Sequence, residues 1–129
     1  MLRPDPVKTK GLHNGRTVQP EIPDRAHARV DRTKIVDYLL SPTHADGRTK
    51  AEFFTRFGFQ VERWQDLAEA LRDTGASNPV SGIVETAYGL RYTVDGPMRA
   101  PDGRAPWVRT VWIVERGSTI ARLITAHPM

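Results

Sequence analysis

The sequence predicts an α+β fold in which N-terminal helices pack on a four-stranded antiparallel β-sheet. From Val30 to Gly75 the apolar residues recur at intervals of three and four, which is typical of helices with one buried face. Beyond Asn78-Pro79 the period changes to two, and short β-branched runs are separated by turn-forming residues. Helices followed by a run of strands indicate a layered α+β domain.

The expected organisation is one folded domain behind an N-terminal extension. Residues 1–28 contain four prolines and two glycines without a lasting hydrophobic period, so we expect an extended arm or linker there. Residues 29–129 are enough for a single domain with its own core. No apolar run approaches the length of a membrane span, and the first residues lack the apolar stretch of a secretory signal. Any export would therefore need a leader region or a dedicated apparatus.

The helical part of the pattern divides into three segments. The first covers residues 32–40. The second begins near Thr49, which can cap it, and ends at Gly58. Its buried side would consist of three aromatic residues: Phe53, Phe54 and Phe57. The third runs from Val61 and would end at Gly75.

Four strands are expected after the helices, over residues 83–87, 90–95, 107–115 and 119–125. The last two are joined by residues 116–118, a connection short enough to form an antiparallel hairpin. In the strand from Trp107 both alternating sets of residues are largely apolar, which indicates an interior position in the sheet.

The amino-acid composition excludes some classes of function and favours others. Without cysteine the chain can form no disulfide, zinc–thiolate site or thiol nucleophile. The net charge is +4, with fifteen arginines against four lysines, and the planar fork of arginine suits bidentate contact with phosphate. A nucleic-acid partner is one explanation of this excess, and a GC-rich genome is the other.

Several enzyme classes lack their motifs here. The chain has no Gly-rich loop ending in Gly-Lys-Ser/Thr, no dinucleotide fingerprint, no nucleophile elbow and no His-Glu-x-x-His. Its acidic residues are scattered, without the clustered carboxylates that a two-metal nuclease needs. The sequence therefore favours chemistry without a metal or cofactor.

The segment from Ser41 to Phe54 is the first candidate site. His44 lies in a polar loop, and an imidazole can take or give a proton at physiological pH. Arg48 and Lys50 fall within one turn of the expected helix start, where free backbone N–H groups favour an anion. The alternatives are that His44 only caps the loop and that the Lys50 stem only covers Phe54.

The last hairpin is the second candidate site. Arg109 is a charge in an interior strand and needs either a ligand, such as phosphate, or an ion pair with Glu85 or Glu115. Thr125 and His127 are two residues apart, so an extended strand would point both at one ligand. Other basic and aromatic residues that could contact a nucleotide are Arg48, Tyr88, Arg91, Trp112 and Arg122. For the aromatic ones the alternative is a place in the core.

Two long strings resemble a bacterial domain family: KIVDYLLSPTHADGRTKAEFFTRFGF and VRTVWIVERGSTIARLITAHP. The family has the form YLL…H…G.(S/T)KA.FF…GF, followed by a tyrosine-glycine strand motif and VW…RL.TA.P. The resemblance covers residues 28–128, and residues 88–103 match its middle section. Domains of this kind commonly lie at the C-termini of bacterial polymorphic toxins and are similar to the barnase, EndoU, colicin and RelE group of metal-independent ribonucleases.

The resemblance implies a catalytic set of His44, Lys50, Arg109 and Thr125. At position 127 the chain has His where the family more often has Tyr, and either ring could contact a nucleotide. We therefore expect a toxin that cleaves RNA, with tRNA as a candidate, by attack of the 2′-hydroxyl on the adjacent phosphate. His44 would move the proton, Lys50 and Arg109 would stabilise the phosphorane, and Thr125 would orient an oxygen.

A toxin of this kind would act in the bacterial cytoplasm, secreted or delivered as part of a larger protein, with no membrane partner. It would need a neutralising immunity protein, acidic enough to cover the basic face. Two other functions remain open: a non-catalytic module that binds RNA or protein, and a toxin directed at a nucleotide such as NAD.

Overall fold

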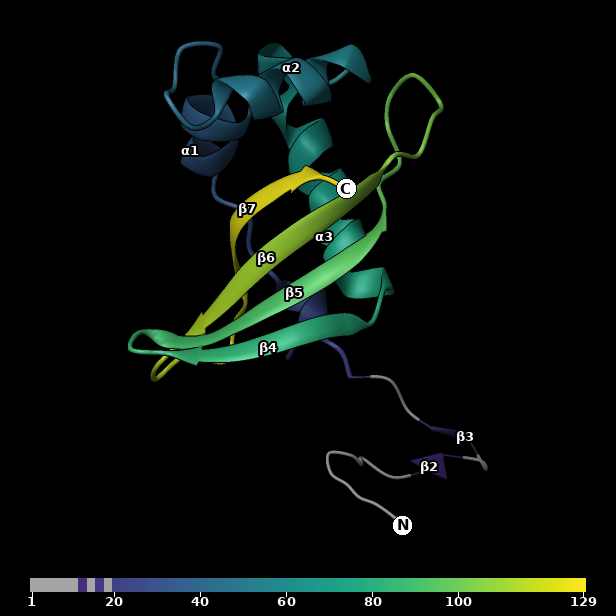
Figure 1. The fold of residues 1–129 in the computed structure, drawn as a ribbon, viewed down its shortest axis with the longest axis vertical. Helices are drawn as coiled ribbons and strands as arrows, with labels where there is room; N and C mark the ends of the chain where they lie inside the picture. Colours follow the sequence, from purple (N-terminus) through teal and green to yellow (C-terminus); the bar gives the residue numbers. More distant parts are fainter. Residues whose placement is uncertain (1–11, 14–15, 18–19) are drawn as a thin grey trace.

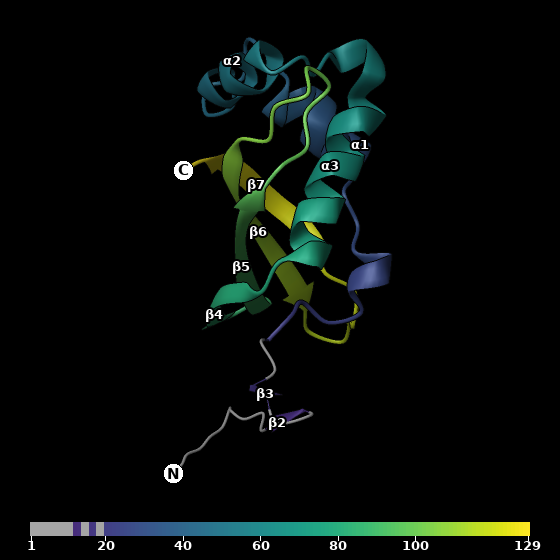
Figure 2. The same cartoon turned by 90° about the vertical axis from the view of Figure 1, so that its right-hand side faces the viewer.

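Figure 1 shows the fold in a computed structural model, which describes residues 12–13, 16–17 and 20–129. The helices α1, α2 and α3 precede four strands that form one antiparallel sheet in the order β4-β5-β6-β7. Helix α3 lies along one face of this sheet, and no helix of the described residues covers the other face (Figure 2). The predicted α+β class, with helices first and an antiparallel sheet second, is confirmed.

The first helical segment changes its winding partway. Helix α1, Arg32–Lys34, continues without interruption into a π-helical turn over Ile35–Leu39. The amide of Leu40 donates to the carbonyl of Ile35 at 2.8 Å, the i to i+5 bond that defines such a turn. Single π-helical turns often mark functional positions, and this one contains Tyr38.

The other two helices keep their expected positions with different ends. Helix α2 is Arg48–Arg56, and its N-cap is Gly47, so the expectation that Thr49 caps it is wrong. Phe54 is fully buried, whereas Phe53 and Phe57 are partly buried against the core. Helix α3, Trp64–Ser77, follows a 3₁₀ turn at Val61–Arg63.

Gly75 lies inside α3, so the expectation that it ends the helix is wrong. A Cβ at this position would lie 2.5 Å from Cζ2 of Trp112, which is far closer than atoms normally approach. The indole N–H of Trp112 donates to Thr110 Oγ1 at 2.8 Å, and that hydroxyl donates to the carbonyl of Val94 at 2.8 Å. Glycine is needed here because the helix rests directly on the fully buried indole ring.

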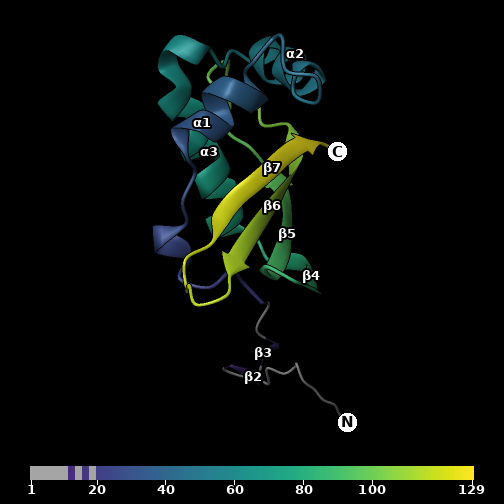
Figure 3. The same cartoon turned by 90° about the vertical axis from the view of Figure 1, so that its left-hand side faces the viewer.

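The strands are β4 Val80–Thr86, β5 Gly89–Pro97, β6 Trp107–Glu115 and β7 Arg122–Pro128. Strand β6 lies between β5 and β7, so its predicted interior position is confirmed. Strand β7 starts and ends three residues later than expected, which brings His127 into the sheet. The view in Figure 3 shows β7 at the sheet edge next to the α1 segment.

The register decides which side chains share the open face. Arg109 pairs with Asp95 on one side and His127 on the other, and Val111 pairs with Thr125. Thr110 and Trp112 point to the helix-covered core, and the alternation of a strand puts Arg109 on the opposite face. Arg109 and Trp112 therefore lie on opposite faces of the sheet.

The expected N-terminal arm lies mostly outside the described residues. Leu12–His13 and Arg16–Thr17 pair as two short antiparallel strands, β2 and β3. From Pro20 onward the chain packs on the body: Val80 N donates to the carbonyl of Pro20 at 2.8 Å, and Ile22 is 2% exposed. The folded body thus includes residues 20–28, which the sequence pattern had assigned to the arm. In the part of the chain that the structure describes, each helix is too short or too polar to span a membrane.

Candidate functional site

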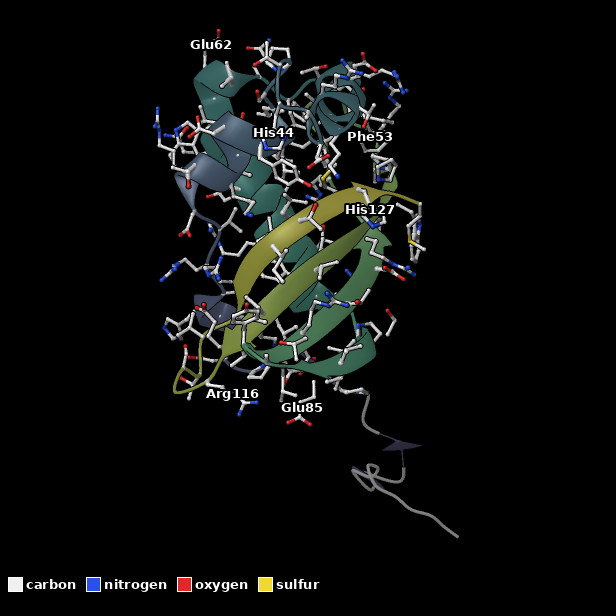
Figure 4. All side chains as sticks on the ribbon, turned by 60° about the vertical axis from the view of Figure 1, so that its left-hand side comes forward. His44, Phe53, Glu62, Glu85, Arg116 and His127 are labelled. Atoms are coloured by element: carbon white, nitrogen blue, oxygen red, sulfur yellow. The ribbon has the colours of Figure 1, made fainter. Side chains whose placement is uncertain are left out.

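Three of the four residues expected to be catalytic meet at one end of the sheet, around Tyr38. His44 comes from the loop before α2, Lys50 from the first turn of α2 and Thr125 from β7. Figure 4 shows His44 near the α1 segment beside β7, and His127 farther along the same end of the sheet. Sequence reasoning brought these segments together but missed the tyrosine that they surround.

A close backbone contact places the His44 loop on Tyr38. A Cβ added to Gly47 would lie 2.2 Å from the Tyr38 carbonyl oxygen and 2.9 Å from its carbon. Only glycine allows the loop to come this near. The glycine of the sequence motif therefore has a specific physical role, which is to hold the loop against the π-helical turn.

His44 already uses one ring nitrogen within the protein. Its Nδ1 accepts hydrogen bonds from the backbone N–H groups of Asp46 at 3.0 Å and Gly47 at 3.1 Å. The loop-capping alternative is therefore the geometry observed. Because Nδ1 is an acceptor, the neutral ring carries its proton on Nε2, and Nε2 can donate a hydrogen bond to a ligand.

Two lysines flank the ring of Tyr38. The Nζ atom of Lys50 lies 5.1 Å from the ring centroid, and that of Lys34 lies 5.4 Å away. Lys50 also donates to the carbonyl of Asp46 at 3.3 Å. The His44 ring meets the same tyrosine edge-on, with centroids 4.9 Å apart. One phenol thus lies among two ammonium groups and one imidazole.

The Tyr38 hydroxyl reaches the edge strand of the sheet. Its Oη lies 3.0 Å from Thr125 Oγ1, at hydrogen-bond distance. Burial acts to raise the pKa of this phenol, but hydrogen bonds with Lys50 and Thr125 and the charges of Lys50 and Lys34 outweigh it, so the pKa is lowered. The available sequence signal was the i,i+4 spacing of Lys34 and Tyr38, which puts both on one helix face.

A pocket of about 580 Å³ opens beside this cluster. Its size lies within the range of small-molecule sites. The polar side chains that line it include Lys34, Asp37, Tyr38, His44, Asp46 and Thr125. Lys34, His44 and the neighbouring Lys50 are the groups here that could contact an anion, and Asp37 and Asp46 line the same pocket. Among the described residues no group of three or more His, Asp or Glu side chains could hold a metal ion.

Arg109 lies next to this cluster but has an acidic partner. Its Nε donates to Asp95 Oδ1 at 2.8 Å and its Nη2 donates to Oδ2 at 2.9 Å. The expectation that Arg109 forms an ion pair with Glu85 or Glu115 is wrong. The hydrogen bonds from Arg109 are the main cause of a lowered pKa of Asp95, helped by the charges of Arg109 and His127. Three guanidinium N–H groups remain for other contacts.

Arg109, His127 and Thr125 share the open face of the sheet, where the two-residue spacing of Thr125 and His127 puts both on one side. Arg109 pairs directly with His127, and Thr125 is its diagonal neighbour on β7, a relation that separates Cα atoms by roughly 7–8 Å. Arg91 lies on the same face, opposite Ile113. Arg122 lies at the start of β7, where its Nη2 is 3.2 Å from Glu115 Oε2.

Three residues expected to bind a nucleotide lie apart from this cluster. Trp112 is 0% exposed, so the expectation that it stacks on a base is wrong. Tyr88 is 76% exposed but lies at the β4–β5 hairpin, next to Gly89, which pairs with Glu115. Glu115 is six residues along β6 from Arg109, a separation of about 20 Å. Arg48 lines a separate cavity of about 490 Å³ together with Glu52 and apolar residues. Figure 4 shows Glu85 and Arg116 near the hairpin end, opposite His127.

The fold and this site define a small α+β domain with an open polar pocket at one edge of the sheet. Residues 21–129 match the family described as "Domain of unknown function (DUF6883)", and the chain belongs to this family. No curated protein matches the chain.

Among solved structures, one similar chain comes from a structure described as "Contact-dependent growth inhibition toxin - immunity protein complex from Klebsiella pneumoniae 342". The two chains superpose with a TM-score of 0.63 and are 22% identical. The match covers 79% of this chain and 100% of that chain. A likeness at this level of identity establishes a shared fold.

Proposed function

We propose that this domain is a toxin that cleaves RNA, with tRNA as a candidate substrate, by attack of a 2′-hydroxyl on the adjacent phosphate. The observation that carries the proposal is that Thr125 meets His44 and Lys50, which come from a distant segment of the chain, around Tyr38 and beside an open pocket. The likeness in fold to a chain of a toxin–immunity protein complex supports the toxin part.

Each residue has a role that its geometry permits. Lys50 places a positive charge where negative charge gathers on the phosphorane. His44 donates from Nε2 to a phosphate oxygen, since Nδ1 is held by two backbone N–H groups. Thr125 orients the Tyr38 hydroxyl or a nonbridging oxygen, and Arg109 extends the anion site along the open face. The first expectation, that His44 moves the proton, is replaced by this donor role.

The partners follow from the same face. RNA would lie across the uncovered side of the sheet, where Arg91, Arg109 and Arg122 are placed. An acidic immunity protein would neutralise the domain by covering that surface. The toxin would act in the bacterial cytoplasm after delivery as part of a larger protein.

The proposal is tested by incubating the purified chain with total RNA in EDTA. The informative variant is His44→Asn, because the Asn Oδ1 can accept the two loop N–H bonds while the Nε2 donor is removed. We expect His44→Asn to stay folded and to lose cleavage by about 100-fold or more. His27→Asn is the matched control, since His27 is an exposed histidine paired with Asp24 in a separate 3₁₀ turn.

Three outcomes would contradict the proposal. Intact RNA after long incubation with the wild-type chain, together with salt-dependent binding, would indicate a binding module. Release of nicotinamide from NAD would indicate a nucleotide-directed toxin. Cleavage of an oligonucleotide that carries a 2′-deoxy sugar at the scissile position would exclude attack by the 2′-hydroxyl.

A further inference from the structure

We propose that Tyr38 is a catalytic residue of this site, whose phenol oxygen takes the proton from the attacking 2′-hydroxyl. The inference rests on the proposed RNA cleavage and assigns the base in that reaction. It concerns a residue for which the sequence predicted only a place in the first helical segment, residues 32–40.

The position of Tyr38 makes it the centre of the cluster. Its Oη is 3.0 Å from Thr125 Oγ1, and its ring has the ammonium groups of Lys50 and Lys34 at 5.1 Å and 5.4 Å from the centroid. The side chain is half-buried and lines the pocket of about 580 Å³. A substrate in this pocket would meet the phenol together with Lys34, and Lys50 lies at the same ring.

The hydrogen bonds of His44 leave the role of base open. Nδ1 accepts from two backbone amides, so Nε2 bears the proton in the neutral ring and cannot accept another. To act as a base, His44 would have to break both bonds of its loop. Tyr38 has no such obstacle, because its hydroxyl partner Thr125 can donate to the phenol oxygen.

The electrostatic surroundings favour the ionised phenol. Burial alone would raise the pKa of Tyr38, but hydrogen bonds with Lys50 and Thr125 and the charges of Lys50 and Lys34 bring the pKa below its ordinary value. The titratable groups around it come from the first helical segment, the loop and α2: Lys34, Asp37, His44, Asp46 and Lys50. The charges that lower the pKa of Tyr38 are those of Lys50 and Lys34, which favour the phenolate.

Tyr38 and Lys50 together account for both proton transfers of the reaction. The O2′–P bond forms and the P–O5′ bond breaks, while the 2′-hydroxyl proton passes to the Tyr38 oxygen. The Lys50 ammonium gives a proton to the departing 5′-oxygen. The products are a 2′,3′-cyclic phosphate and a 5′-hydroxyl. Tyr38 then returns its proton to the Lys50 amine, whose Nζ lies 5.1 Å from the Tyr38 ring centroid, and both groups are restored.

The test compares Tyr38→Phe with Tyr92→Phe in the full chain. Tyr92 is the matched control, because it is a buried tyrosine on the helix-covered face, with a pKa raised by burial. We expect Tyr38→Phe to reduce single-turnover cleavage by about 100-fold or more, the usual contribution of a positioned base. Its affinity for an uncleavable 2′-deoxy oligonucleotide and its circular dichroism spectrum should match those of the wild type.

A second measurement separates catalysis from packing. Replacing Tyr38 by 3-fluorotyrosine acidifies the phenol with little change of shape, so the rising limb of the pH–rate profile should move to lower pH. An unmoved limb, or a Tyr38→Phe variant that cleaves at the wild-type rate, would overturn the role of Tyr38 and leave the proposed function standing. If the wild-type chain cleaves no RNA, the proposed function fails and this inference fails with it.

Discussion

Gly47→Ala tests the contact that builds the site. The glycine has φ −98° and ψ −18°, a conformation that alanine adopts freely, so the backbone itself opposes nothing. The added Cβ would lie 2.2 Å from the Tyr38 carbonyl oxygen. Since carbon and oxygen atoms in contact normally stay about 3.3 Å apart, the loop and the π-helical turn must separate by about 1 Å.

The size of the effect follows from this displacement. Overpacking of this kind costs about 1–3 kcal/mol, and alanine is also a poorer N-cap than glycine. For a chain of 129 residues each kcal/mol lowers Tm by roughly 4 °C, so we expect a fall of about 4–12 °C. A shift of about 1 Å in a positioning loop can reduce a rate about 100-fold. Cleavage should therefore fall by more than the loss of stability explains.

The assay compares thermal unfolding and RNA cleavage, at a temperature where every variant is folded. Gly82→Ala is the matched control, because its Cβ would meet only Thr93 Cβ at 3.9 Å, an ordinary contact. We expect Gly82→Ala to melt and cleave like the wild type. If Gly47→Ala behaves like Gly82→Ala in both measurements, the close packing of the loop on Tyr38 is not what builds the site.

Two further predictions concern the supporting fold. Gly75→Ala should destabilise the chain by about 1–3 kcal/mol in urea unfolding, despite the helix preference of alanine, because its Cβ would lie 2.5 Å from Trp112 Cζ2. A variant more stable than the wild type would disprove this contact. Adding Trp112→Phe to Gly75→Ala should recover part of the lost stability. The lowered pKa of Asp95, due mainly to hydrogen bonds from Arg109, means that the ionised carboxylate stabilises the fold at neutral pH and that this contribution disappears as the pH falls below about 4. Asp95→Asn should therefore be less stable than the wild type at pH 7 and equal to it in acid, and a difference that persists in acid would refute the ion pair.

Local pattern predicted the layers of this fold well. The change of period near Asn78 separated the helices from the sheet, and the alternation along β6 put Arg109 on one face and Trp112 on the other. These features follow from the geometry of a single helix or strand, in which side chains repeat every 3.6 or every two residues. They need no knowledge of the neighbouring elements.

Glycines showed where local pattern is insufficient. Gly75 looks like a helix end in the sequence, yet it lies inside α3 because Trp112, 37 positions later, occupies the space of its side chain. Gly47 is likewise required by the carbonyl of Tyr38. A glycine in a sequence marks either a turn or a close approach, and only the packed structure distinguishes the two.

The residue pattern alone provided the candidate set: a histidine, a lysine, an arginine and a threonine in two separate segments. The tertiary structure decided how these groups are used. In the folded chain Arg109 forms an ion pair with Asp95, and Nδ1 of His44 accepts hydrogen bonds from its own loop. Tyr38 lies between Lys34, Lys50 and Thr125. The physical reason is that partners are set by distances of a few ångströms between distant segments, whereas periodicity reports only which way each residue faces.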